Sequence, residues 1–458
     1  MADDSAWADD GTHVEVIPEV AASPSTVRVG SSTGPDAQVI RVLSINCCLL
    51  PTGLRNRRLT LDGTVGGFGS AIVLWAALSY GLCAALWPRL GAIALAVVPL
   101  LFPFCLFFAF AFAIQFARLF RGALMLAACG ENDSHDHKLE RARGLVDKIV
   151  AGGYDAVVFQ ECYRAIPACG RQAPDEMFDA LAERGGFAHA ARSPGRSRAS
   201  MCMDSGLAIV SKWPIVRTSE CAFGAQTFAT KWCVSRAALH AAIRVTPAGG
   251  EPIVLDVFTM HIEATAEVGG HKQDSSVHRA VEKVRHAQIA ELTQFVARET
   301  AGDGVGGERR ATIVIGDFNA DISWPEGPDG APKYGEAYRT VHEAMSTLSL
   351  RDTVEMKDKA TGAEQPAPQQ DNPSGKVRRL SARRPSYGHG KNERLLTGYH
   401  TFRLLAGKTD DLCFYNPAQL TLDSSDYIEM TTPTPVGAFT HLTDHWGVGV
   451  GLKIGGSA

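Results

Sequence analysis

The sequence has little surplus charge and no sign of a disulfide or zinc framework. It carries 45 Lys and Arg against 49 Asp and Glu, a net charge of −4. This balance argues against a generic nucleic-acid binder, which carries a basic surplus. Its 11 cysteines are an odd number without regular spacing, and no C-x-x-C pair occurs. The N-terminus begins MADDSAWADD, which is acidic and lacks the apolar core of a cleavable secretory signal. A hydrophobic content of 45% and a charged content of 21% exclude global disorder.

Two long stretches contain no Asp, Glu, Lys or Arg. Residues 63–88 are 26 such residues and, after Arg89, residues 90–117 are 28 more. Helices of these lengths would measure roughly 39 and 42 Å, more than the roughly 30 Å of a bilayer's hydrocarbon core. Soluble core helices seldom run so far without a charge, so we expect residues 63–117 to form a transmembrane hairpin of two segments. Pro99 and Pro103 leave open a re-entrant hairpin that enters one leaflet.

Basic residues flank this membrane insert on both sides. They are Arg55, Arg57 and Arg58 before it and Arg118, Arg121, Lys138, Arg141 and Arg143 after it. Positively charged flanks stay on the cytoplasmic side of a membrane. We therefore expect an integral or hairpin-inserted membrane protein whose catalytic domain and termini face the cytosol.

The rest of the chain reads as one folded domain that the insert interrupts. Residues 1–37 are acidic and then Ser/Pro/Gly-rich, which predicts a disordered tail. Residues 38–62 form the first part of the domain and residues 118–458 the remainder. Residues 359–396 are rich in Pro, Gln, Arg and Ser, which predicts a long mobile surface loop.

Short apolar strands alternate with helices in this domain. The expected strands are 38–50, 154–161, 205–211, 252–261, 311–319 and 446–454, and the expected helices are 137–151 and 278–298. Several strands carry polar residues at one end. This arrangement predicts an α/β sandwich with an active site at one rim of its sheets.

Polar residues at these strand ends are the candidates for chemistry. They are Asn46 in the first strand, Glu161 after VVFQ, His261 after VFTM, Asp317 and Asn319 in GDFNAD, and Asp444 and His445 before the last strand. Each one alone has an ordinary explanation as a turn, cap or structural residue. Their ordered combination is more informative.

An Asn in the first strand, QE, S-G-L-x-I-x-S, a strand-terminal His, G-D-F-N-x-D and a final T-D-H resemble the endonuclease/exonuclease/phosphatase superfamily. The resemblance covers about residues 38–60 and 131–454. Within it, NCCLLP, SGLAIVSKWPI, MHIEA and HLTDH are similar to neutral sphingomyelinases. The resemblance implies a four-layer α/β sandwich. It also implies Mg²⁺-dependent hydrolysis of sphingomyelin to ceramide and phosphocholine, with Mn²⁺ as an alternative ion. Membrane-associated members carry their two hydrophobic segments before the catalytic domain, not within it.

The resemblance also implies roles. Glu161 and Asn46 would hold the metal, which suits Mg²⁺ because its protein ligands are oxygens. Asn319 would donate an amide hydrogen to the phosphate. Asp317 and His445 would activate water, and His261 would stabilise or protonate the leaving oxygen. The division of acid and base work between the two histidines remains open.

Two further positions match the family imperfectly. Asp411, in TDDL, stands where the family has R-I-D-Y, and Asp411 or Asp444 would orient His445. Lys231, in FATKW, matches a substrate-binding Lys that has an Asp partner five residues earlier in membrane-bound members. In those members the resemblance implies that the Asp and the Lys act together as a switch. That position is Gln226 here, so either the switch is absent or another carboxylate replaces the Asp.

Other functions remain to be weighed. A phosphoinositide phosphatase of the same fold would need basic residues for several phosphates, and the Arg-rich stretch 378–394 is its only candidate. Another sphingolipid could be the substrate of a related phospholipase C. A nuclease is opposed by the acidic balance and the membrane insert. A non-catalytic membrane scaffold would have lost site residues, and all are present. The expected partners are a membrane lipid and the bilayer, without nucleic acid; the oligomeric state stays open.

Overall fold

The computed structural model describes residues 15–16, 39–47, 49, 138–164, 172–193, 203–227, 234–247, 251–264, 276–301, 308–320, 336–355, 380–381, 411–436, 439–443 and 445–454. All of them belong to one compact unit, formed by residues 1–50 with residues 136–458.

A seven-stranded mixed sheet forms one half of the fold. Its order is β1-β4-β5-β3-β2-β17-β14. The strands are β1 (Glu15–Val16), β2 (Val39–Asn46), β3 (Ala156–Gln160), β4 (His189–Arg192), β5 (Ala208–Ser211), β14 (Leu420–Ile428) and β17 (Gly447–Ile454). The pair β2 and β3 is parallel, whereas β17 and β5 run antiparallel to them. β2 and β17, which are far apart in the sequence, are therefore neighbours inside this sheet.

A six-stranded mixed sheet forms the other half, in the order β10-β13-β9-β8-β7-β6. Its strands are β6 (Ile215–Ala222), β7 (Ala237–Val245), β8 (Ile253–Met260), β9 (Arg309–Asp317), β10 (Arg351–Asp352) and β13 (Asp411–Tyr415). β8 and β9 are parallel, because helix α5 (Ser276–Thr300) carries the chain back between them. Two short pairs complete the strands: β11 (Val354–Glu355) with β12 (Leu380–Ser381), and β15 (Thr431–Val436) with β16 (Phe439–His441).

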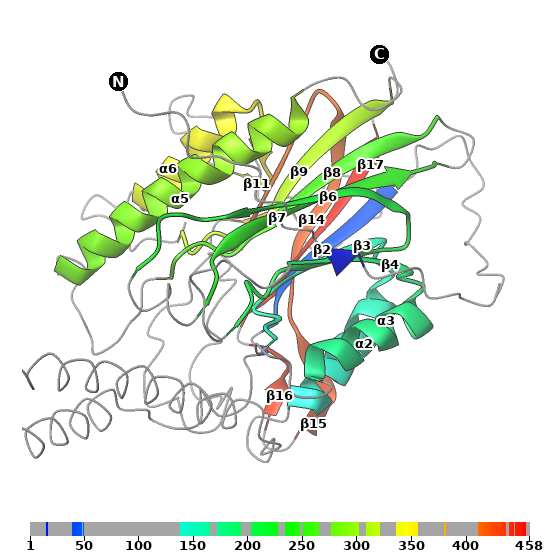
Figure 1. Ribbon diagram of the computed structural model, residues 1–458. Helices are drawn as coiled ribbons and strands as arrows, with labels where there is room; N and C mark the ends of the chain where they lie inside the picture. Colours follow the sequence, from blue (N-terminus) through cyan, green and yellow to red (C-terminus); the bar gives the residue numbers. More distant parts are fainter. Residues whose placement is uncertain are drawn as a thin grey trace, which may run out of the picture. The chain divides into compact units, whose positions relative to one another are not determined.

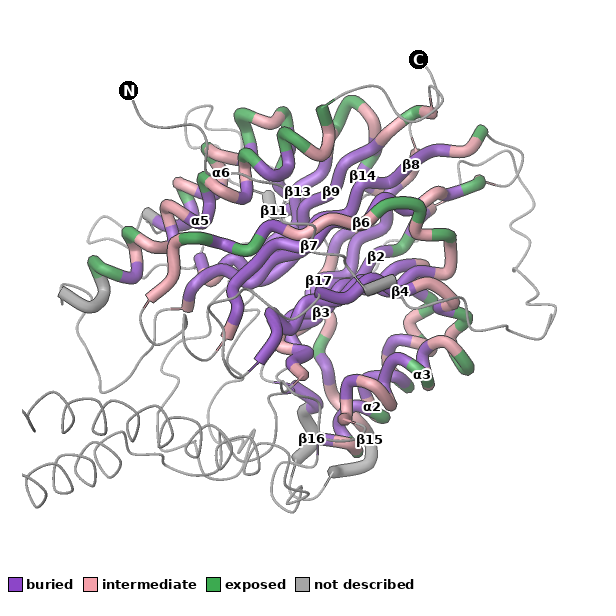
Figure 2. The backbone as a smooth tube through the Cα atoms, in the orientation of Figure 1, coloured by how far each residue is buried: buried purple, intermediate pink, exposed green. Residues whose placement is uncertain are grey.

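Helices cover the outer face of each sheet, as Figure 1 shows. Helices α2 (Lys138–Gly152) and α3 (Ala173–Gly185) pack on the seven-stranded sheet, and α5 and α6 (Glu336–Thr347) pack on the six-stranded sheet. The layers are thus helix, sheet, sheet and helix. Figure 2 shows the buried strands between helices whose outer faces are exposed.

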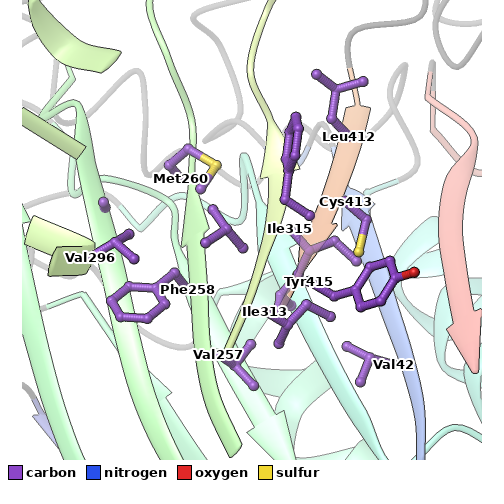
Figure 3. Packing of buried hydrophobic residues seen from close by; sticks show 14 of the residues in the cluster. Val42, Val257, Phe258, Met260, Val296, Ile313, Ile315, Leu412, Cys413 and Tyr415 are labelled. Atoms are coloured by element: carbon purple, nitrogen blue, oxygen red, sulfur yellow. The ribbon is translucent and has the colours of Figure 1, made fainter. Parts of the chain in front are cut away.

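The alternation of β2 places its side chains in two different cores. Leu43 and Ile45 pack with α2 and α3, whereas Ile40 and Val42 join the core between the sheets. Figure 3 shows Val42 close to β9 and β13 residues of the other sheet. Because side chains alternate with a period of two, Asn46 points the same way as Val42, toward the six-stranded sheet.

The predicted α/β sandwich is confirmed, and all six expected strands and both expected helices are present. Within the predicted disordered tail, however, residues 15–16 pair with β4. Within the predicted loop 359–396, residues 380–381 pair with β11. Residues 63–117, the expected transmembrane hairpin, lie outside the described residues. Among the residues that the structure describes, no helix is both long and apolar enough to span a membrane.

Candidate active site

Three adjacent strands of the six-stranded sheet bring predicted site residues together at one rim. His261 follows β8 and forms a parallel bridge with Asp317, the last residue of β9. Asp317 is paired in register with Asp411, the first residue of β13. All three side chains are buried. Strand register therefore produces a row of His, Asp and Asp.

Asn46 reaches this row from the opposite sheet. Its Nδ2 donates a hydrogen bond of 2.9 Å to Oδ2 of Asp317, and the backbone N–H of Asn319 donates one of 2.9 Å to Oδ1. Just beneath, the buried amide of Gln160 donates to Thr259 Oγ1 at 2.7 Å and ties β3 to β8. These bonds across the sandwich fix the first strand against the row.

His445 is oriented by Asp411. Its Nδ1 lies 2.8 Å from Asp411 Oδ2, and both side chains are buried. With Nδ1 as donor to the carboxylate, Nε2 of a neutral imidazole has a lone pair that can accept a proton. Asp411 is thus in contact with the histidine that it was predicted to orient. Asp444, the alternative, lies outside the described residues.

His261 is held by a tyrosine. The hydroxyl of Tyr163 lies 3.2 Å from His261 Nδ1, and His261 Nε2 lies 3.5 Å from Asp317 Oδ2 and 3.8 Å from Glu161 Oε1. Burial raises the pKa of Tyr163, so its hydroxyl stays protonated and can donate to Nδ1. The proton of the imidazole then sits on Nε2, facing the two carboxylates.

The electrostatics of the row keep His261 neutral. Burial, followed by the charges of Arg236 and His445, lowers the pKa of His261 well below its usual value. Burial, together with the nearby Asp411, raises the pKa of Asp317 to about 7. Perturbed groups of this kind are typical of functional sites.

Backbone strain marks two site residues. Glu161 and Asn319 have positive φ angles of 51° and 48°. Such a conformation costs about 1–3 kcal/mol for a residue with a side chain, although Asn tolerates it better than most. Strain of this kind persists where the surroundings impose it, which often happens at functional sites. Asn319 Nδ2 also donates to the carbonyl of Ile262 at 2.9 Å, which fixes its amide.

The donor atoms fit a divalent cation. Asp317, Asp411 and His445 offer ligand atoms that lie within 4.8 Å of one another. Glu161 adds a partly exposed carboxylate beside His261. Carboxylate oxygens are ligands for Mg²⁺ and Mn²⁺. The predicted metal residue Asn46 donates one amide hydrogen to Asp317.

Sequence reasoning missed Arg236, just before β7. This arginine is 7% exposed, and its Nε and Nη1 atoms are buried without a hydrogen-bond partner among the residues that the structure describes. It interacts electrostatically with Glu263, Glu161 and Asp317. A buried guanidinium with unused donors is suited to bind an anion. The sequence feature that could have identified it is an Arg directly before the apolar run AALHAAI.

Two other predictions concern the segment before Arg236. Lys231 lies outside the described residues. Gln226, at the position of the missing switch Asp, donates its side-chain amide to the carbonyl of Phe223 at 2.8 Å. Tyr163 is a second residue that the sequence did not reveal, because nothing in QECYR distinguishes it from a core tyrosine.

Comparison with known proteins supports the predicted resemblance. No family model matches the chain. A sphingomyelinase of Dictyostelium discoideum is 27% identical over 221 residues, which are 45% of this chain and 45% of that protein. The match therefore spans less than half the length of this relative. This match shows a similarity to a sphingomyelinase at the level of the amino-acid sequence.

Solved structures with partial similarity include two bacterial proteins. Sphingomyelinase C from Streptomyces griseocarneus is 15% identical with a TM-score of 0.49, covering 91% of this chain and 99% of that one. A beta toxin variant from Staphylococcus aureus with bound magnesium ions is 14% identical with a TM-score of 0.44, covering 69% and 93%. The four-layer architecture of this chain is established by its own strand pairing.

Proposed function

We propose that this protein is a metal-dependent phosphodiester hydrolase of membrane lipids. Its most suitable substrate is sphingomyelin, which it would cleave to ceramide and phosphocholine. The observation that carries the proposal is the buried group of His445 with Asp411, His261 with Tyr163, and the two donors Asn46 and Arg236. This group combines a base, a neutral hydrogen donor and anion-binding groups at one rim. The sequence similarity to a sphingomyelinase supports the choice of lipid.

His445 would act as the general base. Its Nδ1–H contact with Asp411 leaves Nε2 as the acceptor for a proton from the attacking water. The Asp411 carboxylate then stabilises the imidazolium that forms. This geometry favours His445 over His261 as the base.

His261 would stabilise the leaving oxygen as a hydrogen-bond donor. Its lowered pKa keeps the ring neutral, and the Tyr163 contact directs the remaining N–H to Nε2. A neutral imidazole can donate that hydrogen without first capturing a proton from solvent.

Arg236 and Asn319 would bind the non-bridging phosphate oxygens. Arg236 has two buried donor atoms to offer, and charge-assisted hydrogen bonds to phosphate are the strongest that a side chain makes. Mg²⁺ or Mn²⁺, held by Glu161 with Asn46, would neutralise phosphate charge when bound. The substrate-binding role predicted for Lys231 stays a prediction, and Arg236 would act in addition to it.

A substrate panel tests this function. Purified full-length protein in detergent micelles with Mg²⁺ is given sphingomyelin, ceramide phosphoethanolamine, an inositol sphingolipid, phosphatidylcholine, a phosphoinositide and DNA. Products are identified by mass spectrometry, with a His445→Asn variant as the inactive control. We expect ceramide and phosphocholine. Release of inorganic phosphate from the phosphoinositide, or of nucleotides, would replace the proposal with a phosphatase or a nuclease.

We also propose that residues 63–117 fix the enzyme in a membrane with both termini in the cytosol. The support is the two uncharged runs and the basic residues on both flanks. Alkaline carbonate extraction should leave the protein in the pellet. Release into the supernatant contradicts insertion, and glycosylation of an acceptor site engineered into the N-terminal tail contradicts the orientation.

A further inference from the structure

Helix α2 contributes a fully buried arginine to the back of the site. Arg141 is 0% exposed, and its Nη1 donates to the carbonyl of Leu442 at 2.8 Å. The same atom lies 3.5 Å from the carbonyl of Cys47. Leu442 stands three residues before His445, and Cys47 directly follows Asn46. One guanidinium thus connects two chain segments that carry site residues.

The same two segments are joined a second time. Thr443 donates its hydroxyl to the carbonyl of Asn46 at 2.6 Å and accepts a hydrogen bond from the backbone N–H of His445 at 3.3 Å. Leu442 is also held by Met430, whose carbonyl accepts its N–H at 2.8 Å. The contacts of Arg141 and Thr443 therefore converge on the backbone between Leu442 and His445.

The helix approaches this backbone unusually closely. A Cβ atom at Gly144, one turn after Arg141, would lie 2.6 Å from Cδ2 of Leu442. The absence of a side chain at Gly144 lets the helix come close enough for Arg141 to reach the carbonyl groups. Hydrophobic packing alone does not explain the buried guanidinium of Arg141. An apolar side chain of similar volume would fill the same space without the free-energy cost of removing a charge from water.

We propose that Arg141 is a positioning residue that sets the placement of Asn46 relative to His445. It touches neither substrate nor reacting atoms and acts through the carbonyl groups of Leu442 and Cys47. The planar, multiply donating guanidinium can hold two carbonyl groups from different segments in a fixed relation. This inference rests on the proposed function, since it concerns the geometry of the same site.

The predicted signature is a loss of turnover without a loss of binding. In the full-length protein, Arg141→Met should lower kcat by about 10–100-fold, the usual size of an effect from a group that orients a site residue. KM should change less than about twofold, because Arg236 and Asn319, the groups proposed to bind the phosphate oxygens, lie on other segments of the chain. Arg141→Lys should recover part of kcat.

Two controls separate positioning from stability. Arg143→Met changes the same residue type two positions along the same helix, where the side chain is 61% exposed, and should leave kcat unchanged. Ile149→Val, in the apolar core under the same helix, should lower Tm but not kcat at a temperature well below both transitions. If Arg141→Met loses activity only in proportion to its unfolded fraction, Arg141 is merely structural.

A double-mutant cycle with Thr443→Val tests the shared backbone. Effects on kcat should be less than multiplicative, because both residues act through the segment between Leu442 and His445. Multiplicative effects, or a change confined to KM, overturn the proposal. If Arg141→Met does not fold, Arg141→Lys and Thr443→Val carry the cycle.

Hydrogen exchange distinguishes this proposal from the proposed function. Arg141→Met should accelerate amide exchange at residues 442–443 and 445–447 and leave β8 unchanged. If the unaltered protein turns over no substrate but this local acceleration occurs, the proposed function fails and the structural coupling stands. Unchanged exchange at 442–447 with an active parent enzyme overturns the positioning role alone.

Discussion

In the part of the chain that the structure describes, two buried His–Asp hydrogen bonds have equal lengths but very different surroundings. His445 Nδ1 lies 2.8 Å from Asp411 at the rim, and His240 Nε2 lies 2.8 Å from Asp256 beneath helix α5. Around the second pair, Arg310 binds Asp256 through two nitrogens at 2.8 and 2.7 Å, and Ser219 meets the other ring nitrogen of His240 at 3.1 Å. Every group of this second pair has a matched partner.

The surroundings of the two pairs shift the pKa of a carboxylate in opposite directions. Burial opposes ionisation of Asp256, but hydrogen bonds from His240 and Arg310 outweigh it and lower its pKa. At the rim, burial and the nearby Asp411 raise the pKa of Asp317 to about 7. A satisfied ionic network stabilises a fold, whereas concentrated like charges mark a site that awaits a ligand. Proximity of His and Asp alone therefore does not identify a catalytic pair.

Removal of metal should give the largest difference between the site at the rim and the His240–Asp256 pair. Exhaustive dialysis against EDTA should abolish turnover, and Mg²⁺ or Mn²⁺ should restore it, while the His240 network needs no ion. Glu161→Gln should lower kcat by more than about 10³-fold and remove the rise in Tm that added metal gives the parent protein. The exposed Glu343 on α6 supplies the control Glu343→Gln. Full activity after dialysis contradicts the metal dependence.

The same substitution in each His–Asp pair should produce opposite defects. His445→Asn should lower kcat by about 10³-fold or more with little change in unfolding free energy. His240→Asn should lower the unfolding free energy by about 2–4 kcal/mol, because Asp256 loses one of its buried hydrogen bonds and Ser219 loses its contact with the imidazole. Its kcat per folded molecule should be unchanged. Activity assays paired with urea unfolding decide this, and a large kcat defect in His240→Asn would give the second pair a catalytic role.

Sequence reasoning found the rim because its residues stand at strand ends. Glu161, His261, Asp317 and Asn319 each follow an apolar run, so local patterning located them and strand register brought them together. The strand β7 was missed because AALHAAI is rich in Ala, which has low strand propensity and gains its place only by burial between α5 and the other sheet. With β7 unrecognised, nothing directed attention to Arg236 at its start.

Tertiary contacts supplied what the pattern could not. The choice between Asp411 and Asp444 as the partner of His445 depends on a pairing of β13 with β9 that is distant in sequence. The tautomer of His261 depends on Tyr163, which lies in the segment that follows β3. Hydrophobic periodicity specifies which face a residue occupies but not which polar partner it meets there.

The buried Arg236 and the half-buried Arg310 should also respond in opposite ways. Arg236→Gln should lower kcat/KM by about 10²-fold, since it removes charged donors to phosphate, and should leave the unfolding free energy unchanged or raised. Arg310→Gln should lower the unfolding free energy by about 2–3 kcal/mol with normal kcat/KM, because Asp256 loses its main partner. A stability loss in Arg236→Gln with normal kinetics would make it a structural residue like Arg310.

A half-buried carboxylate, Glu220, has a hydroxyl group as its hydrogen-bond partner and should produce the smallest effect. Glu220 of β6 is hydrogen-bonded by the hydroxyl of Ser193. Burial, with a further contribution from Asp204, raises the pKa of Glu220 to about 7. Because the folded state holds the proton more tightly than the unfolded state, the stability from this group is complete below about pH 4.5. It is lost as the pH rises through about 7.

The test is the pH dependence of the unfolding free energy in urea. Between pH 5 and pH 8, the parent protein should lose about 1–2 kcal/mol more than Glu220→Gln does; the full shift is discounted because the side chain is partly exposed. Asp204, with its own pKa raised to about 6, titrates in both proteins, so the difference reports Glu220 together with its interaction with Asp204. Glu183→Gln, at an exposed position on α3, should follow the parent. If Glu220→Gln and the parent lose stability in parallel, the Glu220 carboxylate is not buried in its neutral form, and the contrast with Asp256 is confined to the rim.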